Sequence, residues 1–187
     1  MSEFEYLLVL VSVLVGVALS DLATSLHRLL LDRHRVRWDW LSPCAALMAT
    51  LAILRFWWKF YHLGQGEIWT HFGPFLLLLV QLLQLVLLAC SALPDHANDI
   101  DLRRYYEEQS RYFWLLFSSY VVVAIAFNAV AGVNPPVGTL LPTLAINLIS
   151  SLAFLGLALI RRRRLHEIGL PLLTIYFLCI FLPQELA

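Results

Sequence analysis

The stretch FLLLLVQLLQLVLLAC, which runs from Phe75 to Cys90, decides the fold class of this chain. It contains no charged side chain, and Gln81 and Gln84 are its only polar members. A helix that crosses the hydrocarbon core of a bilayer needs about 20 predominantly apolar residues. Together with its flanks, over residues 70–93, this stretch is long enough, so we predict that it is a transmembrane helix.

Five other stretches have a similar length and composition, and together they predict an all-α polytopic membrane protein with one transmembrane domain over residues 1–187. The six expected spans are residues 4–31, 41–63, 70–93, 112–131, 137–160 and 165–182. The last span is short, and Gly169 and Pro171 interrupt its beginning. A re-entrant or tilted short segment is therefore the alternative for this part of the chain.

The composition excludes a water-soluble globular protein. Hydrophobic residues make up 60% of the sequence and charged residues only 14%, whereas soluble domains carry about 45–50% apolar and about 25% charged residues. Cys44, Cys90 and Cys179 lie in apolar stretches without CxxC spacing, which argues against a disulfide scaffold or a zinc site. The first apolar run follows Glu3 and Glu5 instead of a basic region, so we expect a membrane helix and not a cleaved signal peptide.

The basic residues predict the orientation of the spans. The sequence has 13 lysines and arginines, and all but Arg55 and Lys59 lie in or beside the first, third and fifth connections. These residues are Arg28, Arg33, Arg35, Arg37, Arg103, Arg104, Arg111 and Arg161 to Arg164. Basic residues accumulate in cytoplasmic loops. We therefore expect these three connections in the cytoplasm, with the N-terminus and the C-terminus outside.

The connection between the third and fourth spans has a helical charge pattern. Oppositely charged residues follow each other at i,i+4 spacing in the pairs Arg103–Glu107, Arg104–Glu108 and Glu107–Arg111. Asp99 or Asp101 is expected to cap the start of this helix, because a carboxylate there can accept hydrogen bonds from free backbone N–H groups. The helix should then continue into the fourth span.

Several polar side chains are expected within the membrane, where charged groups usually face the protein interior or a water-filled cavity. The candidates are Asp21, Arg55, Gln81, Gln84 and Asn147. If the faces of their helices converge, they form a polar core at similar depths. This core would be a route or binding site for a small ion, proton or polar solute, with Asp21 as the titratable or cation-contacting group. The alternative is structural: Asp21 pairs with Arg55 or Arg28, and the amides join helices by hydrogen bonds.

A second group of candidates is expected at the outer side, around the connection between the second and third spans. It consists of Lys59, His62, Glu67 and His71. Two facing histidines can hold a haem or a metal, so His62 and His71 provide a haem or metal alternative. Acid, base and cationic groups together also permit an enzyme acting on a lipid headgroup. No HExxH or GxSxG motif supports that chemistry, so we predict no catalytic residue and no cofactor.

Three segments carry a resemblance to a known group of proteins. They are FEYLLVLVSVLVGVALSDLATSLHRLL at residues 4–30, FWW at residues 56–58 and DLRRYYEEQSRYFW at residues 101–114. In these segments the chain resembles a family of small bacterial inner-membrane proteins without an assigned function. The resemblance covers about the first two-thirds of the chain. It implies a multi-pass protein of the bacterial inner, or cytoplasmic, membrane, and it transfers no active site.

These patterns together favour a channel or transporter-like role. The alternative is a non-catalytic membrane scaffold or accessory subunit. We expect a homo-oligomer, because one small bundle leaves little room for an enclosed pathway. The lipid bilayer is the expected partner and nucleic acid is not, because arginines 161–164 directly follow an apolar span and are typical of a topology anchor that also meets anionic lipid.

Overall fold

The structure, a computed structural model, describes residues 3–63, 71–95, 101–132, 137–160 and 162–181. The described part of the chain is all-helical, which confirms the expected fold class, and it contains six α-helices. The helices are α1 (Glu3–Leu31), α2 (Leu41–His62), α3 (Phe72–Ala92), α4 (Leu102–Val130), α5 (Val137–Leu159) and α6 (Arg163–Phe181). An isolated backbone bridge between Arg37 and Asp101 joins the segments before α2 and α4.

Five of these helices are long and apolar enough to cross a membrane, which supports a polytopic membrane protein. Their apolar parts are Phe4–Leu31, Leu41–His62, Phe72–Ala92, Leu102–Val130 and Leu140–Leu159. α6 differs because its 19 residues include Arg163, Arg164 and Glu167 in the first two turns. Its apolar part is therefore shorter than that of the other helices.

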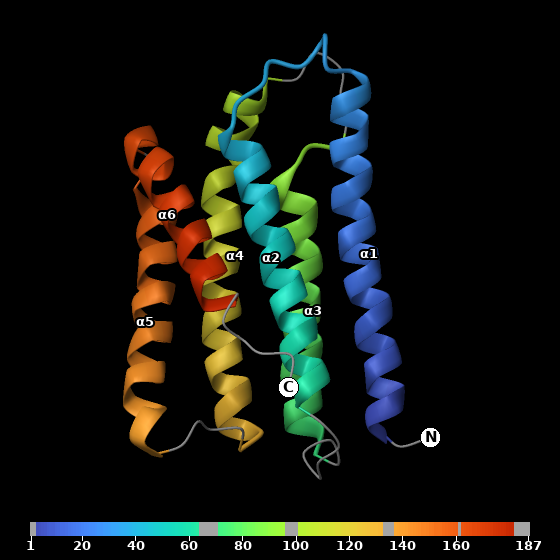
Figure 1. The fold of residues 1–187 in the computed structure, drawn as a ribbon, viewed down its shortest axis with the longest axis vertical. Helices are drawn as coiled ribbons and strands as arrows, with labels where there is room; N and C mark the ends of the chain where they lie inside the picture. Colours follow the sequence, from blue (N-terminus) through green and yellow to red (C-terminus); the bar gives the residue numbers. More distant parts are fainter. Residues whose placement is uncertain (1–2, 64–70, 96–100, 133–136, 161, 182–187) are drawn as a thin grey trace.

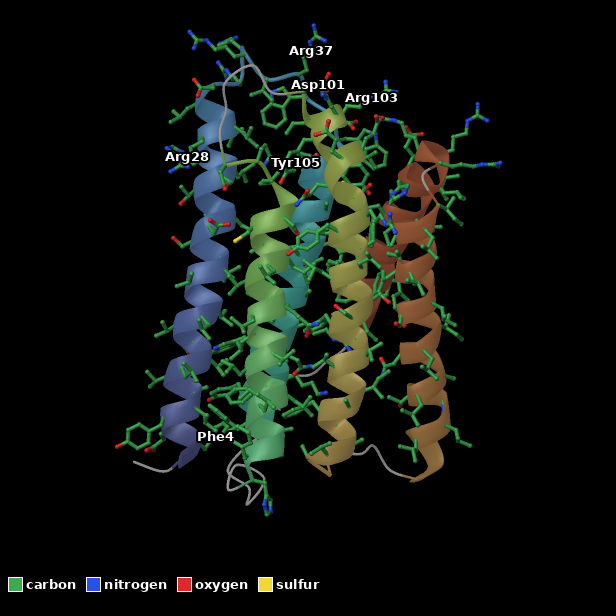
Figure 2. The ribbon with its side chains drawn as sticks, turned by 180° about the vertical axis from the view of Figure 1, so that it is seen from behind. Phe4, Arg28, Arg37, Asp101, Arg103 and Tyr105 are labelled. Atoms are coloured by element: carbon green, nitrogen blue, oxygen red, sulfur yellow. The ribbon has the colours of Figure 1, made fainter. Side chains whose placement is uncertain are left out.

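The helices run alternately up and down, so their ends form two groups (Figure 1). α1, α3 and α5 end, and α2, α4 and α6 begin, toward the upper end in this view. Arg28, Arg37 and Arg103 lie toward this end, whereas Phe4 lies at the other (Figure 2). We call the first the arginine-rich end and the second the opposite end. The alternate placement of the basic residues along the sequence thus corresponds to one end of the bundle.

Helix α4 connects the two sides of the bundle. It packs against α3 on one side and α5 on the other, while α2 contacts α1, α3 and α6. Ala45, Ala49 and Ala52 are buried on α2, and small residues of this kind let neighbouring helices approach closely. By contrast, the outer face of α5 exposes large apolar side chains such as Leu141 and Ile149. Such a face is suited to contact with lipid.

The start of α4 follows the expected pattern. The Asp101 side chain accepts hydrogen bonds from the backbone N–H groups of Arg103 and Arg104 and so caps the helix, as predicted. Arg103 also pairs with Glu107, and Arg104 pairs with Glu108, at N–O distances of 3.1 and 2.9 Å. The other cap candidate, Asp99, lies outside the described residues. α4 therefore begins in the polar connection and extends into the apolar span as one helix.

The alternation of helix ends gives a test of membrane crossing. In a background with the three cysteines replaced by serine, the exposed residues His34, His71 and Arg164 are each changed to cysteine. A membrane-impermeant thiol reagent should label His34→Cys and Arg164→Cys from one side of sealed vesicles, and His71→Cys only from the other. The reason is that position 34 follows the end of α1 and position 164 lies at the start of α6, both at the arginine-rich end, whereas position 71 precedes α3 at the opposite end. Figure 1 shows these two ends of the bundle. Labelling of all three from the same side would contradict this arrangement.

Candidate functional site

A cavity of about 620 Å³ lies among α2, α4 and α5. Gln81 of α3 and Tyr176 and Phe177 of α6 complete its lining. Its polar lining includes Arg55 and Lys59 of α2, Gln81 of α3, Asn128 of α4 and Asn147 of α5. Three of the five residues predicted for a polar core, Arg55, Gln81 and Asn147, therefore line one cavity. Among the lining residues that the structure describes, none is an aspartate or a glutamate.

Arg55 is the central charge of this cavity. Its guanidinium carbon lies 5.7 Å from the centre of the Phe177 ring, so it makes a cation–π contact with α6. In the part of the chain that the structure describes, the guanidinium has no hydrogen-bond acceptor and no ion-pair partner. Five N–H donors of one charged group are therefore left for whatever enters the cavity.

Lys59 lies one turn beyond Arg55 on α2, toward the opposite end of the bundle. Its ammonium group donates a hydrogen bond of 2.8 Å to the side-chain oxygen of Asn128, which joins α2 to α4. Because an amide is uncharged, this hydrogen bond does not neutralise Lys59. The two cations reinforce each other's positive potential at this wall of the cavity.

Gln81 lies deeper in the bundle and is only 4% exposed. Its amide makes no hydrogen bond to another described residue, yet its nitrogen and oxygen are not completely buried. The amide therefore faces the cavity. A buried polar group of this kind is usually hydrogen-bonded, so its free donors and acceptor mark this position as one that can bind a ligand.

Asp21 and Gln84, the other two core candidates, lie outside the cavity. Asp21 is next to the thiol of Cys90, between α1 and α3. A hydrogen bond from Trp57 to Ser12 shows which positions of α1 and α2 lie at the same level. From that level Arg55 lies roughly 3 Å, and Asp21 roughly 13 Å, toward the arginine-rich end, given a rise of about 1.5 Å per residue. The different heights separate the two charges, and no ion pair joins them among the described residues.

Gln84 has a structural partner. Its amide nitrogen donates a hydrogen bond of 3.0 Å to the hydroxyl oxygen of Ser119, so it joins α3 to α4. The amide oxygen of Gln84 is buried and has no partner within the described ranges. Although Gln81 and Gln84 are only one turn apart on α3, their surroundings differ. Gln81 faces the cavity, and Gln84 lies between two packed helices.

The outer-side candidates are only partly brought together. Lys59 and His62 line the cavity, and the His62 ring packs edge-on against Trp58 with centroids 4.6 Å apart. His71 is exposed just before α3, and Glu67 lies outside the described residues. Within the described segments, no group of three histidine, cysteine, aspartate or glutamate residues could hold a metal ion. The haem or metal alternative through His62 and His71 stays a prediction.

A buried hydrogen-bond chain at the arginine-rich end was not predicted from the sequence. Trp114 donates from its indole N–H to the Tyr106 hydroxyl at 3.2 Å. In the His166 ring, Nε2 lies 3.0 Å from the carbonyl oxygen of Ile160. Because a carbonyl oxygen can only accept a hydrogen bond, Nε2 carries a hydrogen. The Tyr106 hydroxyl can then donate to Nδ1 of a neutral His166, 3.0 Å away. The chain joins α4 to the beginning of α6.

Ion pairs around Arg163 strengthen the same end. Arg163 contacts the carboxylates of Asp39 at 2.9 Å, Glu167 at 2.8 Å and Glu107 at 3.4 Å. It thereby joins the start of α6 to α4 and to the segment before α2. The sequence shows Arg163 only as one of four consecutive arginines. Glu167 follows it at i,i+4 spacing, but Asp39 and Glu107 are far away along the chain, and no spacing pattern could have identified these two.

Comparison with known proteins gives no identification. No family model matches the sequence, and no match is found among curated proteins or solved structures. The resemblance to small bacterial inner-membrane proteins stays a prediction.

The Arg163 ion pairs predict a measurable contribution to stability. Arg163→Gln should lower the free energy of unfolding by about 1–3 kcal/mol, because it leaves the buried Asp39 carboxylate without its cation. Removing both charges, in the Asp39→Asn and Arg163→Gln double variant, should recover part of this loss. Unfolding in mixed micelles with increasing dodecyl sulfate gives the measurement. Arg164→Gln, an exposed neighbour, is the control, and an equal effect of both single variants would contradict the assignment.

Proposed function

We propose that this chain is a transporter-like membrane protein that binds an anionic substrate in the cavity beside Arg55. The observation that carries the proposal is the guanidinium of Arg55, which lines the cavity without an acceptor or a carboxylate partner among the described residues. This narrows the broader expectation of an ion, proton or polar solute. It favours an anion over a proton or metal cation.

The physical reason is the cost of an unpaired charge within a membrane. A charged side chain in the hydrocarbon region is expensive unless water or an opposite charge compensates it. Lys59 increases the positive potential, and the lining described here contains no carboxylate to reduce it. A bound anion would lower the energy of both cations. Guanidinium groups suit this task because they form paired hydrogen bonds with carboxylate and phosphate oxygens.

The proposal includes a membrane orientation. The arginine-rich end is cytoplasmic according to the positive-inside rule, α6 is a short sixth span, and the termini lie outside. Lys59 and His62 lie near the end of α2 that belongs to the opposite end of the bundle. The cavity therefore opens toward the non-cytoplasmic side, in a bacterial inner membrane. Assembly into a homo-oligomer remains part of this prediction.

The two ends of the bundle support a transport-type role over a passive pore. At the arginine-rich end, the Arg163 ion pairs and the Tyr106–His166 hydrogen bond join α2, α4 and α6. At the opposite end, the cavity is lined by cationic and amide groups. A binding site accessible from one side is the arrangement that alternating access requires. A non-catalytic scaffold has no need for an unpaired cation facing a cavity.

Charge-selective labelling tests the proposal without knowledge of the substrate. In the cysteine-free background, Thr143→Cys provides a thiol in the cavity lining. An anionic methanethiosulfonate reagent should react about tenfold faster than a cationic one, relative to the same pair of reagents on free glutathione, because the cavity concentrates anions. Arg55→Gln should bring this ratio close to that of glutathione. The reaction should proceed from the side that labels His71→Cys.

The matched control is Arg104→Gln, which removes an exposed arginine at the arginine-rich end and should leave the labelling ratio unchanged. A ratio that is unaffected by Arg55→Gln, or one that favours the cationic reagent, would reject the anion site. An unreactive thiol at position 143 would also reject an accessible cavity and would support the scaffold alternative.

A further inference from the structure

Four residues that line the cavity lie at different depths. Counted from the end of α2 at His62, Lys59 and Arg55 lie roughly 5 and 10 Å into the bundle, at about 1.5 Å per residue. Gln81 lies roughly 14 Å from the start of α3, and Phe154 roughly 25 Å from the start of α5. Of these four residues, the two cations thus lie nearest this end, Gln81 next and Phe154 deepest. Asn128, which accepts from Lys59, lies at the level of the cations.

We propose that the anion bound in this cavity is the headgroup of a phospholipid from the leaflet at the opposite end. This inference depends on the proposed function and names the substrate class. The phosphate binds Arg55 and Lys59, the glycerol-ester oxygens bind Gln81 and Asn147, and the acyl chains extend toward Phe154. A lipid in that leaflet has the same order of charge, ester and hydrocarbon from the surface to the bilayer centre.

Gln81 distinguishes a lipid from a simple anion. Its amide is more than nine-tenths buried, faces the cavity and has no hydrogen-bond partner among the described residues. Phosphate held at Arg55 and Lys59 alone would leave this amide unsatisfied, which is unfavourable in a buried site. An ester carbonyl or a glycerol hydroxyl next to the phosphate supplies the missing partner. The ligand therefore needs a polar body beside its charge.

The size of the cavity and the position of α6 agree with this substrate. A volume of about 620 Å³ is in the range of pockets for organic ligands and much larger than one inorganic anion requires. α5 and α6 approach each other near the arginine-rich end, where Gly169 lies next to Leu157. Farther along, α5 packs on α4 while α6 packs on α2 (Figure 1). Both helices line the cavity, α5 with Asn147 and α6 with Phe177, so acyl chains in it would lie between them.

The test compares four defined probes on the detergent-purified full chain. Dioctanoyl phosphatidylglycerol is the anionic lipid, and dioctanoyl phosphatidylcholine has the same chains without net charge. Glycerol phosphate and inorganic phosphate supply the anion without acyl chains. Microscale thermophoresis gives the dissociation constants. Phosphatidylglycerol should bind at least about tenfold more tightly than each of the other three, because only it offers net charge, ester oxygens and chains together.

Matched variants connect this binding to the cavity. Arg55→Gln and Gln81→Leu should each weaken phosphatidylglycerol binding by about tenfold or more, since each removes a hydrogen-bonding partner of the ligand. Gln84→Leu is the control for Gln81→Leu, because it changes the same residue type one turn away, outside the cavity. Arg104→Gln is the control for Arg55→Gln. Both controls should stay within about twofold of the unmodified chain, and thermal unfolding checks that each variant is folded.

The outcomes separate the two proposals. If inorganic phosphate or glycerol phosphate binds as tightly as phosphatidylglycerol and Arg55→Gln weakens that binding, the anion site stands and the lipid is rejected. Equal binding of phosphatidylglycerol and phosphatidylcholine also rejects an anionic lipid. If Arg55→Gln leaves the binding of every probe unchanged, both the lipid and the anion site are rejected. An effect of Gln84→Leu as large as that of Gln81→Leu rejects the assignment of Gln81 to the ligand.

Discussion

The packing of Trp114 is the interaction on which the cavity depends. This side chain is fully buried on α4, and its ring stacks on Phe154 of α5 with centroids 5.8 Å apart. It also donates to Tyr106, which contacts His166 of α6. One residue thus connects α4 to α5 directly and to α6 through Tyr106. α5 packs chiefly on α4, and the Ser118–Ser151 hydrogen bond joins the same two helices. Together with the Trp114 stacking, it holds the wall that carries Asn147, and the cavity needs that wall.

The same side-chain chemistry has different surroundings at the two ends of the bundle. Arg163 is next to the carboxylates of Asp39 and two glutamates, so its charge is compensated within the protein. Arg55 and Lys59 line a cavity whose described lining has no carboxylate. A compensated arginine stabilises the fold, whereas an uncompensated one raises the energy of the protein alone and makes anion binding favourable. This contrast, and not the mere presence of arginine in a membrane helix, separates a structural role from a functional one.

The sequence predicted those features that depend on one segment at a time. The length of the apolar runs predicted the helices. Arg55 and Gln81 were candidates because they are polar residues within such runs, and both line the cavity. It did not predict that Asp21 lies apart from Arg55, because the heights of neighbouring helices depend on their packing and on the lengths of their connections. Nor did it predict the contact between Tyr106 and His166. That contact joins two residues that are far apart in the chain. It depends on the angle at which α4 and α6 meet, and no local sequence pattern around either residue indicates that angle.

Helix α6 contributes both to the contacts at the arginine-rich end and to the lining of the cavity. Arg163 and His166 hold its beginning, and Phe177, in its second half, contacts Arg55. Pro171 lies between them and lacks the N–H that would continue the helical hydrogen bonds. The contact with the Phe177 ring uses the charge of Arg55 but none of its five N–H donors. An oxyanion that approaches these donors therefore displaces no acceptor in the described part of the protein, which makes Arg55 better suited to recognising a ligand than to joining helices.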